Sequence, residues 1–440
     1  MSELLTMQAE ISLVAIILFM LLADLILKTP NHKPLQTLAC TLMVVQLALN
    51  IVPASGEAFG GMYHASQMAS VVKTILTAGT LLVFLQSGEW LSREDTRHKA
   101  GEFYMLTLST LLGMYFMVSA GSFILFYVGL ELASIPMACL VAFDKYRHHS
   151  AEAGAKFILN SMFSSALMLY GISMVYGTTG TTYFADITNA LPGAPLQVLA
   201  KVFVIGGLGS SLRLVPFHMW TPDTYQGAPT NVSAYLSVIS KGAAAFALMS
   251  ILVKVFGQMV ADWSLLLSIV IVVTITIANI FAILQEDLKR FMAYSSISQA
   301  GYIMLAVLGG NEQGMASLVY YIVVYLVDNL DLVMTMALFS LAGIPPFAGF
   351  FSIFFVFASA FHSGHWLVVF LALVNTIISL YYYLLIVKAM YITPNDAPVA
   401  TFRTPALART GLFICLIGVI VLGICSGVYE LLNHVAGLGF

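Results

Sequence analysis

Two ionisable residues of opposite charge, Glu131 and Lys241, each lie in the middle of an apolar stretch long enough to cross a membrane. Glu131 is near the centre of residues 121–143, and Lys241 lies equally deep in residues 231–256. A charge at that depth costs about 3 kcal/mol on insertion scales, so it requires a partner or a function. Burial and a nearby opposite charge act in opposite directions on protonation, so a pair held between them can exchange protons. The two residues therefore predict proton or ion movement; the alternative is a fixed ion pair or a polar contact between helices.

Arg213 and His218 flank a proline in the segment LRLVPFHMW, which interrupts another apolar stretch. Histidine titrates near neutral pH, so His218 suits a proton shuttle; alternatively, it only satisfies carbonyl groups freed where the helix breaks. The guanidinium of Arg213 stays protonated, so it is predicted to tune a neighbouring charge electrostatically rather than to carry protons. The alternative for Arg213 is that its side chain extends to the membrane surface and has no such role.

Glu152 and Lys156 are four residues apart and share one face of a predicted helix. This spacing favours an ordinary ion pair worth a few tenths of a kcal/mol in water. The pair begins a helix on the side that the loop charges predict to be cytoplasmic, so the alternative is a role at the entrance of a proton route. Lys73, Lys201 and Lys254 lie near the ends of apolar segments and are predicted to anchor the chain at the membrane interface.

Other residues that could do chemistry have plainer interpretations. Three consecutive tyrosines at 381–383 are predicted to form an interface belt or a packing surface. The cysteines sit inside apolar segments without CxxC spacing, so they are predicted to be small buried hydrophobes rather than disulfides or metal ligands: Cys40, Cys139, Cys415 and Cys425. No metal site and no catalytic redox residue is expected in this chain.

The composition explains why these charges must be positioned by membrane helices. Hydrophobic residues make up 60% of the chain and charged residues 9%, and the mean hydropathy is +0.93. Soluble domains have about 45–50% apolar and about 25% charged residues, so the sequence predicts an integral membrane protein. The apolar segments have the length of helices rather than of barrel strands, which indicates a polytopic all-α bundle. The formal net charge of −3 comes with no basic run, so no nucleic-acid partner is expected.

The hydrophobic pattern predicts about 14 transmembrane helices in a single membrane domain. Their expected ranges are 9–27, 35–53, 67–86, 103–119, 121–143, 153–176, 196–213, 231–256, 263–285, 289–309, 314–327, 332–359, 367–391 and 408–433. Basic residues favour cytoplasmic loops, and here they follow the odd-numbered helices, which predicts that both termini face outward. These residues are Lys28, Lys33, Arg93, Arg97, Lys99, Lys145, Arg147, Lys289, Arg290, Lys388, Arg403 and Arg409.

Two of the predicted helices carry prolines in mid-span, Pro216 in one and Pro345-Pro346 in the other. Proline removes a backbone donor and clashes with the preceding turn, so each helix is expected to split into two halves. Freed backbone groups at membrane depth are tolerated only inside protein or against a water-filled cavity. A matched pair of broken helices indicates a transporter built from two repeats. Residues 239–241 (ISK) also align with 378–380 (ISL), although chance similarity between apolar helices is the alternative.

Several segments together resemble subunit N of proton-pumping NADH–quinone oxidoreductase, respiratory complex I. They are GLELASIP at 129–136, SAEAGAKFIL at 150–159, VPFHMWTPDTYQGAPTNVSAYLSVISK at 215–241, FMAYSSISQAGY at 291–302 and SLAGIPPFAGFF at 340–351. The resemblance covers nearly the whole chain. It implies an antiporter-like subunit, related to the multisubunit sodium/proton antiporters, with two inverted five-helix repeats formed by helices 4–8 and 9–13.

The resemblance also implies roles for individual residues. Glu131 matches the glutamate of helix 5, Lys241 the lysine of helix 8, and His218 the histidine at the break in helix 7. Glu152 and Lys156 match a charged pair at the start of helix 6. The expected division of the chain is N-terminal helices at 1–100, a first repeat at 101–256, a second repeat at 257–391 and a C-terminal helix at 392–440.

Three departures from the family pattern fall on the expected proton route. The family has a lysine in helix 7 where this chain has Ser211, and another in helix 12 where it has Ile353. The family has a longer helix 11 and a substantial connection after it, where this chain has only residues 328–331. The predicted helix of 14 residues would span only about 21 Å, which is less than a membrane core. The chain is thus either an altered or shortened sequence or a divergent member.

The sequence therefore predicts a proton-translocating subunit of an NADH:quinone oxidoreductase in a bacterial inner membrane. The resemblance implies that NADH, FMN, iron–sulfur clusters and quinone are bound by partner subunits and that no cofactor is bound by this chain. Its expected partners are other membrane subunits of complex I and membrane lipid. Two alternatives remain open: a cation/proton antiporter subunit, and a structural subunit of the membrane arm whose route is inactive because of Ser211 and Ile353.

Overall fold

The computed structural model describes residues 2–27, 33–190, 193–329, 334–393, 405–425 and 427–437. Among these residues, ten helices are long and apolar enough to cross a membrane, and three shorter apolar helices accompany them. The prediction of a polytopic helical membrane protein is confirmed. Leu330 and Asp331, in the predicted short connection, lie outside the described residues, as do Lys28 and Arg403 of the basic loops.

The first part of the chain forms a helical bundle with one small hairpin. Its helices and strands are α1 (Ser2–Thr6), α2 (Gln8–Leu27), α3 (Lys33–Asn50), β1 (Gly56–Ala58), β2 (Tyr63–Ala65), α4 (Gln67–Leu91), α5 (Ala100–Val118), α6 (Phe123–Val141), α7 (His148–Thr179), α8 (Phe184–Asn189), α9 (Pro195–Ser211), α10 (Trp220–Gly227), α11 (Thr230–Tyr235) and α12 (Lys241–Lys254). The antiparallel strands β1 and β2 pair Glu57 with His64. The sequence analysis did not predict this hairpin.

The remaining helices complete the bundle. They are α13 (Val260–Ile283), α14 (Leu288–Gly309), α15 (Glu312–Asn329), α16 (Met334–Leu341), α17 (Ala348–His362), α18 (Trp366–Tyr391), α19 (Ala406–Ile424) and α20 (Gly427–Gly437). The single helix expected at 408–433 is divided at Cys425, where the backbone is extended. Helix α15 has 18 residues rather than the predicted 14, and its length of about 27 Å is still slightly less than a membrane core of about 30 Å.

Local sequence signals set where several helices begin and end. The side chain of Ser66 accepts a hydrogen bond from the amide of Ala69 and caps α4, and Asp287 caps α14 through the amide of Arg290. Such side chains satisfy amides that the first turn of a helix leaves free. Gly180 and Gly310 end α7 and α14 with φ of 72° and 63°, a backbone conformation that glycine adopts without a steric penalty.

Both helices are broken near the prolines, as the sequence analysis predicted, and the two breaks share one backbone geometry. After α9, the amide of Leu214 donates to the carbonyl five residues earlier at 2.8 Å; after α16, the amide of Ile344 does the same at 3.1 Å. The residue before each of these amides has a positive φ, 64° at Arg213 and 72° at Gly343. Both helices therefore end in the same left-handed C-terminal turn, and α10 and α17 follow in new directions.

The helix that carries Lys241 is continuous but changes its winding. Helix α11 passes into a π-helical turn at Leu236–Ser240, and α12 begins at Lys241. Such turns occur mostly as single bulges inside α-helices, often at functional sites. The bulge ends directly before the lysine, so it helps to set the direction of that side chain.

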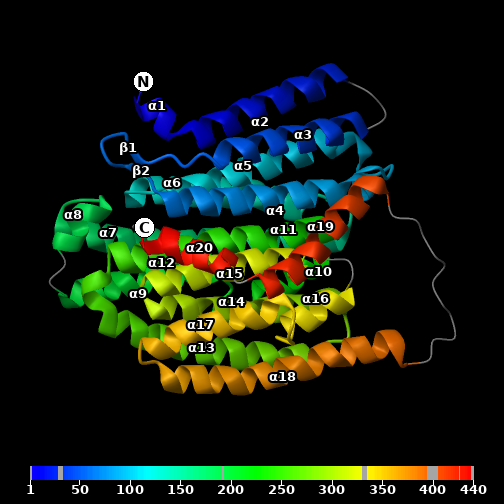
Figure 1. The fold of residues 1–440 in the computed structure, drawn as a ribbon. Helices are drawn as coiled ribbons and strands as arrows, with labels where there is room; N and C mark the ends of the chain where they lie inside the picture. The colour runs from blue at the N-terminus through cyan, green and yellow to red at the C-terminus, as the bar shows by residue number, and fades with distance from the viewer. Residues whose placement is uncertain are drawn as a thin grey trace.

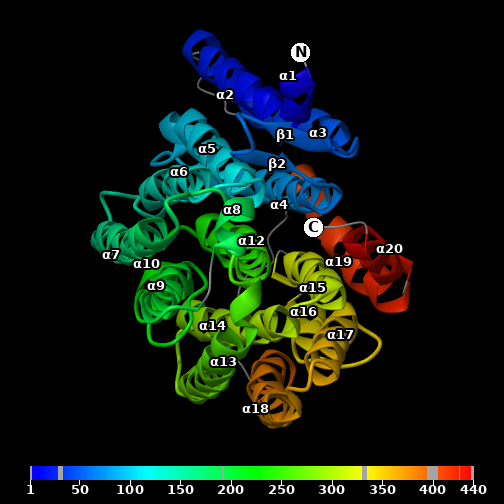
Figure 2. The same cartoon turned by 90° about the vertical axis from the view of Figure 1, so that its left-hand side faces the viewer.

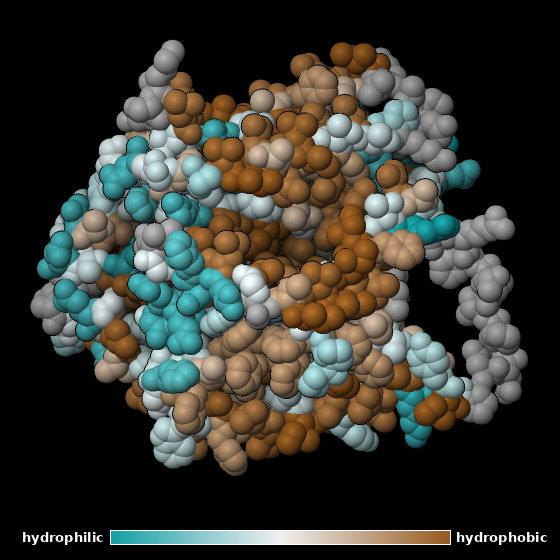
Figure 3. Space-filling model, viewed as in Figure 1, coloured by the Kyte–Doolittle hydropathy of each residue, from teal (hydrophilic) through white to brown (hydrophobic). Residues whose placement is uncertain are grey.

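Figure 1 shows the long helices lying side by side, with both chain termini at the same end of the bundle. Figure 2 looks along the bundle: the N-terminal helices lie at one edge, α12 lies in the middle, and α18 lies at the opposite edge. Helices α19 and α20 return across the bundle and pack against α4 and α15. In Figure 3, apolar residues cover much of one side, and polar residues gather at the end that carries the hairpin.

Two glycines bring α5 and α6 into close contact. A Cβ atom added at Gly113 would lie 2.4 Å from the amide nitrogen of Ala133, and one added at Gly129 would lie 2.8 Å from the carbonyl oxygen of Gly113. These atoms belong to the backbone and cannot move aside like a flexible side chain. The missing side chains therefore allow the two helix backbones to touch, as small residues do in membrane bundles, and they fix the position of α6, which carries Glu131.

The predicted basic loops meet at one end of the bundle, which we call the basic end. Arg147 lies 3.3 Å from Asp95 of the preceding basic loop, and the ammonium of Lys289 donates to the carbonyl of Ala228 at 2.9 Å. We call the opposite end, which carries β1 and β2, the hairpin end. The basic loops were predicted to follow every second helix, and their position at one end of the bundle agrees with this. Which end faces the cytoplasm stays a prediction.

Candidate functional site

Lys241 is fully buried at the centre of the bundle. Its ammonium donates to the backbone carbonyl of Ser296 at 2.6 Å, to the hydroxyl of Ser296 at 2.7 Å and to the hydroxyl of Tyr325 at 3.3 Å. It also lies 4.7 Å from the centroid of the Tyr325 ring. The hydroxyl of Ser237 completes this cluster, 3.2 Å from Ser296 and 3.1 Å from Tyr325. The ammonium is thus held by oxygens from α14 and α15 that carry no formal charge.

Polar side chains continue from Lys241 into the second half of the chain. On α15, Tyr321 lies one turn from Tyr325, with ring centroids 6.4 Å apart, and its hydroxyl donates to the side-chain carbonyl of Gln299. The amide of Gln299 donates to the hydroxyl of Tyr383 at 3.3 Å. We call Lys241, Ser296, Tyr325, Tyr321, Gln299 and Tyr383 the polar row; all six are buried. The sequence analysis missed every member except Lys241, although the spacing of Tyr321 and Tyr325 on one helical face was a usable signal.

Arg213 is also fully buried, so the alternative that it reaches the membrane surface was wrong. Its guanidinium donates to the backbone carbonyl of Leu236 and lies 5.6 Å from the ring centroid of Trp220 and 5.3 Å from that of Tyr225. Leu236 begins the π-helical turn that ends directly before Lys241. Electrostatic tuning of a neighbouring group by this fixed charge stays a prediction.

His218 lies in the turn between α9 and α10, as predicted, and is 7% exposed. Its Nδ1 atom is buried without a hydrogen-bond partner among the described residues. The imidazole nevertheless lies within hydrogen-bonding reach of the backbone of Pro216 at the break, so both interpretations of His218 stay predictions. The histidine is not hydrogen-bonded to Lys241 or to Glu131 in the described part of the chain.

Glu131 is half-buried on α6 and lies apart from Lys241, since no ion pair or hydrogen bond joins them among the described side chains. Its neighbours along that face, Val128 and Ile135, are both exposed. The carboxylate therefore faces the outside of the isolated chain, and the fixed ion pair with Lys241, which was the alternative interpretation, is not formed among the described side chains.

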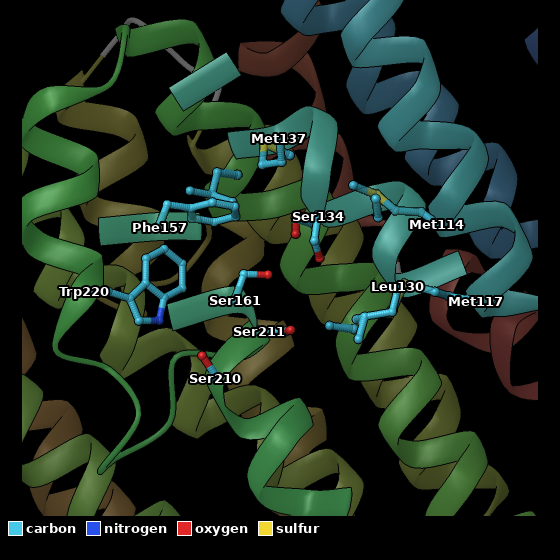
Figure 4. A pocket seen from close by; sticks show the side chains of 14 residues that line it. Met114, Met117, Leu130, Ser134, Met137, Phe157, Ser161, Ser210, Ser211 and Trp220 are labelled. Carbon is cyan, nitrogen blue, oxygen red and sulfur yellow. The ribbon is translucent and has the colours of Figure 1, made fainter. Parts of the chain in front are cut away.

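A cavity of about 40 Å³ lies between the helices that carry Glu131 and Lys241, and Figure 4 shows its lining. Ser134, one turn after Glu131, lines it on one side, and Ser240, which precedes Lys241, lines it on another. The hydroxyls of Ser134, Ser161 and Ser211 point toward its middle. A cavity needs roughly 10–15 Å³ to hold one water, so this one has room for about three.

The two positions where the family pattern has lysine lie beside cavities. Ser211 lines the cavity just described. Ile353 lines a smaller one of about 10 Å³, together with Gln299, Tyr321 and Asp328. In each case the chain has a small or apolar side chain next to a cavity that polar and apolar side chains line together.

Glu152 and Lys156 form the predicted ion pair, with 2.7 Å between carboxylate and ammonium. The structure extends it to a cluster at the basic end, because Lys156 also lies 2.6 Å from Asp223, which lies 2.8 Å from Arg290. Burial by itself would raise the pKa of Asp223, but hydrogen bonds from Lys156 and Arg290 outweigh it and hold the pKa below its usual value. The sequence analysis missed Asp223 and Arg290 as members of this cluster.

The expectations for the lysines and for the cysteines were wrong in part. Lys73 is 4% exposed and forms a buried ion pair with Glu10, and Lys201 is 1% exposed and lies 3.3 Å from Asp262. Neither is a simple interfacial anchor, because helices cover both. The expected packing surface is formed by Tyr382 and Tyr383, which are buried and hydrogen-bonded, whereas Tyr381 is exposed. None of the four cysteines, all of which the structure describes, forms a disulfide, but Cys139 and Cys425 are exposed rather than buried.

Among the described residues, one group of potential metal ligands comes together: His148, His149 and Glu152. All three are exposed at the start of α7, and Glu152 is already paired with Lys156. The group therefore belongs to the charged cluster at the basic end.

A membrane bundle with two broken helices and a buried row of titratable and polar side chains has the architecture of an antiporter-like membrane subunit. The family described as NADH:quinone oxidoreductase/Mrp antiporter, TM matches residues 120–335 and 327–379. A curated relative from Phocaeicola vulgatus, named NADH-quinone oxidoreductase subunit N, is 63% identical over 467 positions that cover 99% of each chain. A relative of the same name from Desulforamulus reducens is 34% identical over 94% of each chain. The chain belongs to the NADH-quinone oxidoreductase subunit N family.

Solved structures agree with this assignment. A chain of respiratory complex I from Thermus thermophilus, solved with bound aureothin, superposes with a TM-score of 0.81 at 29% identity, covering 95% of this chain and 97% of the other. A chain of the Mrp complex from Dietzia sp. DQ12-45-1b superposes with a TM-score of 0.84 at 18% identity, covering 99% and 97%. The second similarity shows a common fold.

The comparisons also locate the departure near residue 330. The family match falls into two segments that overlap at 327–335. The 467 aligned positions of the Phocaeicola vulgatus relative exceed the 440 residues of this chain by 27. At least that many residues of the relative have no counterpart here, and the divided family match is consistent with their loss between α15 and α16.

Proposed function

We propose that this chain is a proton-translocating, antiporter-like subunit of an NADH-quinone oxidoreductase in a bacterial inner membrane. The observation that carries the proposal is the polar row: a buried lysine bonded only to neutral oxygens, at membrane depth, and continued by hydroxyl and amide side chains. An ionisable residue inside a membrane bundle is by default a functional residue. Hydrogen-bonded hydroxyls can pass a proton along, while Lys241 can store one.

Protons would be taken up at the basic end, near Glu152, Lys156 and His218. They would then pass through the cavity between Glu131 and Lys241 that Ser134, Ser161, Ser211 and Ser240 help to line, which we call the serine-lined cavity. The cavity supports this step because about three waters could join groups that do not touch. From Lys241 the route would continue along the polar row. Arg213 would favour release of the proton from Lys241, because its fixed charge repels the ammonium.

The outward position of Glu131 supports a neighbouring membrane subunit as its partner. A carboxylate on the apolar outer face of α6 is costly against lipid, and a subunit packed there would cover it. The relatives are named as subunits of an NADH-quinone oxidoreductase, so we infer that NADH, flavin, iron–sulfur and quinone chemistry takes place in such partners. The chain itself would contribute proton movement.

We further propose that residues 101–256 and 257–391 form two antiporter-like repeats, between N-terminal helices at 1–100 and a C-terminal helix at 392–440. The shared backbone geometry of the breaks after α9 and α16 supports this division. Pro216, Pro345 and Pro346 would keep both helices interrupted at membrane depth, because proline has no backbone N–H to donate within the helix.

A second candidate is a structural subunit whose own route is inactive. Ser211, Ile353 and the divided family match favour it, because all three fall on the route of the first candidate. A third, a cation/proton antiporter subunit without a redox partner, would make transport depend on sodium.

The test is proton uptake per NADH oxidised by the assembled complex in inverted membrane vesicles. Lys241→Met and Glu131→Gln should lower this ratio, whereas Lys388→Met and Glu312→Gln, which change exposed residues, should not. An unchanged ratio in Lys241→Met would favour the structural candidate. Sodium dependence without NADH oxidation would favour the antiporter.

A further inference from the structure

Asp328 is a buried carboxylate outside the polar row. It lies near the end of α15, about 24 Å along the helix from Glu312 at 1.5 Å per residue, and is 3% exposed. A carboxylate so placed is costly unless its surroundings stabilise it or its protonation has a use. The sequence analysis noted Asp328 only as the start of a short connection.

The position of Asp328 connects it to the polar row. Tyr321, Tyr325 and Asp328 are spaced by four and three residues, so they share one face of α15. All three line the cavity of about 10 Å³ that Gln299 also lines, which has room for about one water. The charge of Asp328 is close enough to act on the hydroxyls of Tyr321 and Tyr383.

Asp328 differs chemically from everything else around this cavity. The remaining lining consists of hydroxyl, amide and apolar groups: Gln299, Tyr321, Val324, Tyr325, Ser340, Leu341, Gly349, Ser352 and Ile353. Hydroxyls and amides can relay a proton but do not hold one near neutral pH, whereas a carboxylate can do both. Asp328 is therefore the one described residue at this cavity that can store a proton.

We propose that Asp328 is the proton-accepting group of the second half of the chain, at the end of α15 that points to the basic end. The inference rests on the proposed function. The ammonium of Lys241 releases a proton and becomes a neutral amine. The hydroxyls of Tyr325 and Tyr321 each accept a proton and release another, and the water in the cavity passes the last one to the carboxylate of Asp328, which becomes a neutral acid. No bond between heavy atoms changes.

The experiment compares variants of the assembled complex in inverted vesicles, with NADH oxidation and proton uptake measured together. Asp328→Asn keeps the size of the side chain but removes its ability to hold a proton, and Asp328→Glu keeps the carboxyl group. Ile353 lines the same cavity, so Ile353→Lys in the Asp328→Asn background supplies a new titratable group there. Glu312→Gln is the matched control, because it removes an exposed carboxylate from the same helix.

We expect Asp328→Asn to lower protons per NADH as much as Lys241→Met does, with Asp328→Glu and the Asp328→Asn/Ile353→Lys double variant retaining pumping. Pumping by Asp328→Asn equal to that of Glu312→Gln would overturn the inference. If Asp328→Asn does not assemble, Asp328→Glu decides: retained pumping supports the inference, and an assembled but uncoupled enzyme overturns it. Loss in Lys241→Met without loss in Asp328→Asn removes this inference alone, whereas no loss in Lys241→Met removes the proposed function.

Discussion

The ammonium of Lys73 lies 2.6 Å from the carboxylate of Glu10, and both side chains are almost completely buried among the N-terminal helices. The hydroxyl of Tyr63 donates to Glu10 and accepts from Lys73, each at 2.9 Å. The pair joins α2 to α4, and Tyr63 joins both to the hairpin. This contact links helices that pack beside, rather than within, the proposed proton route.

Removing one member of this pair should destabilise the fold. Lys73→Met leaves a buried, uncompensated carboxylate, and Glu10→Gln leaves an uncompensated ammonium; either should cost about 3–5 kcal/mol. The Glu10→Leu/Lys73→Met double variant removes both charges and should recover most of the loss, apart from about 1–3 kcal/mol for the unpaired hydroxyl of Tyr63. Unfolding of the purified chain in detergent measures all three. Equal stability of the single variants and the parent would contradict the prediction.

Gly113→Ala should disturb the contact between α5 and α6, because the new methyl group would meet the backbone of Ala133. We expect a destabilisation of about 1–3 kcal/mol, typical of overpacking, and a lower proton-uptake ratio because α6 carries Glu131. The control is Gly177→Ala in α7, where a new Cβ meets nothing within 4 Å. That change should be neutral or stabilise the helix by roughly 0.5–1 kcal/mol. A Gly113→Ala chain as stable as the parent would show that the two helices can separate freely.

The cluster at the basic end should lose stability on acidification. Asp223 has a pKa below its usual value in the folded chain, because hydrogen bonds from Lys156 and Arg290 outweigh its burial. Its contribution is therefore complete above the unfolded pKa of about 3.9 and is lost as the pH falls through the lower folded pKa. Asp223→Asn should remove this part of the pH dependence. Parallel stability curves below pH 4 for parent and variant would rule the contribution out.

Two substitutions of Ser211, by methionine and by lysine, test whether the serine-lined cavity takes part in proton transfer. The two new side chains have similar lengths. Ser211→Met should fill the cavity, displace its water and lower protons per NADH, since the step between Glu131 and Lys241 would lose its bridge. Ser211→Lys also fills the space but adds a titratable group, and should retain or raise the ratio. Proton uptake at equal rates of NADH oxidation gives the comparison. Equal ratios in both variants would mean that the cavity takes no part in transfer.

Much of the fold followed from local signals in the sequence. Apolar stretches of about 20 residues predicted the spans, and Pro216, Pro345 and Pro346 predicted the breaks, because both features act within a single helix. The hairpin at 56–65 was missed, since its residues carry no clear alternation. The length of α15 was underestimated because hydropathy does not show where a helix ends among polar residues such as Asp328.

The sequence by itself determined that ionisable residues lie at membrane depth, because a lysine in the middle of an apolar span lies wherever that helix crosses the membrane. It also determined the family, through segments such as 215–241. Only the tertiary structure decided which groups meet: Lys241 bonds to Ser296 and Tyr325, Glu131 faces outward, and Lys73 pairs with Glu10. The reason is that hydrophobic periodicity fixes the spans, whereas the contacts of a polar side chain depend on how separate helices rotate and pack against one another.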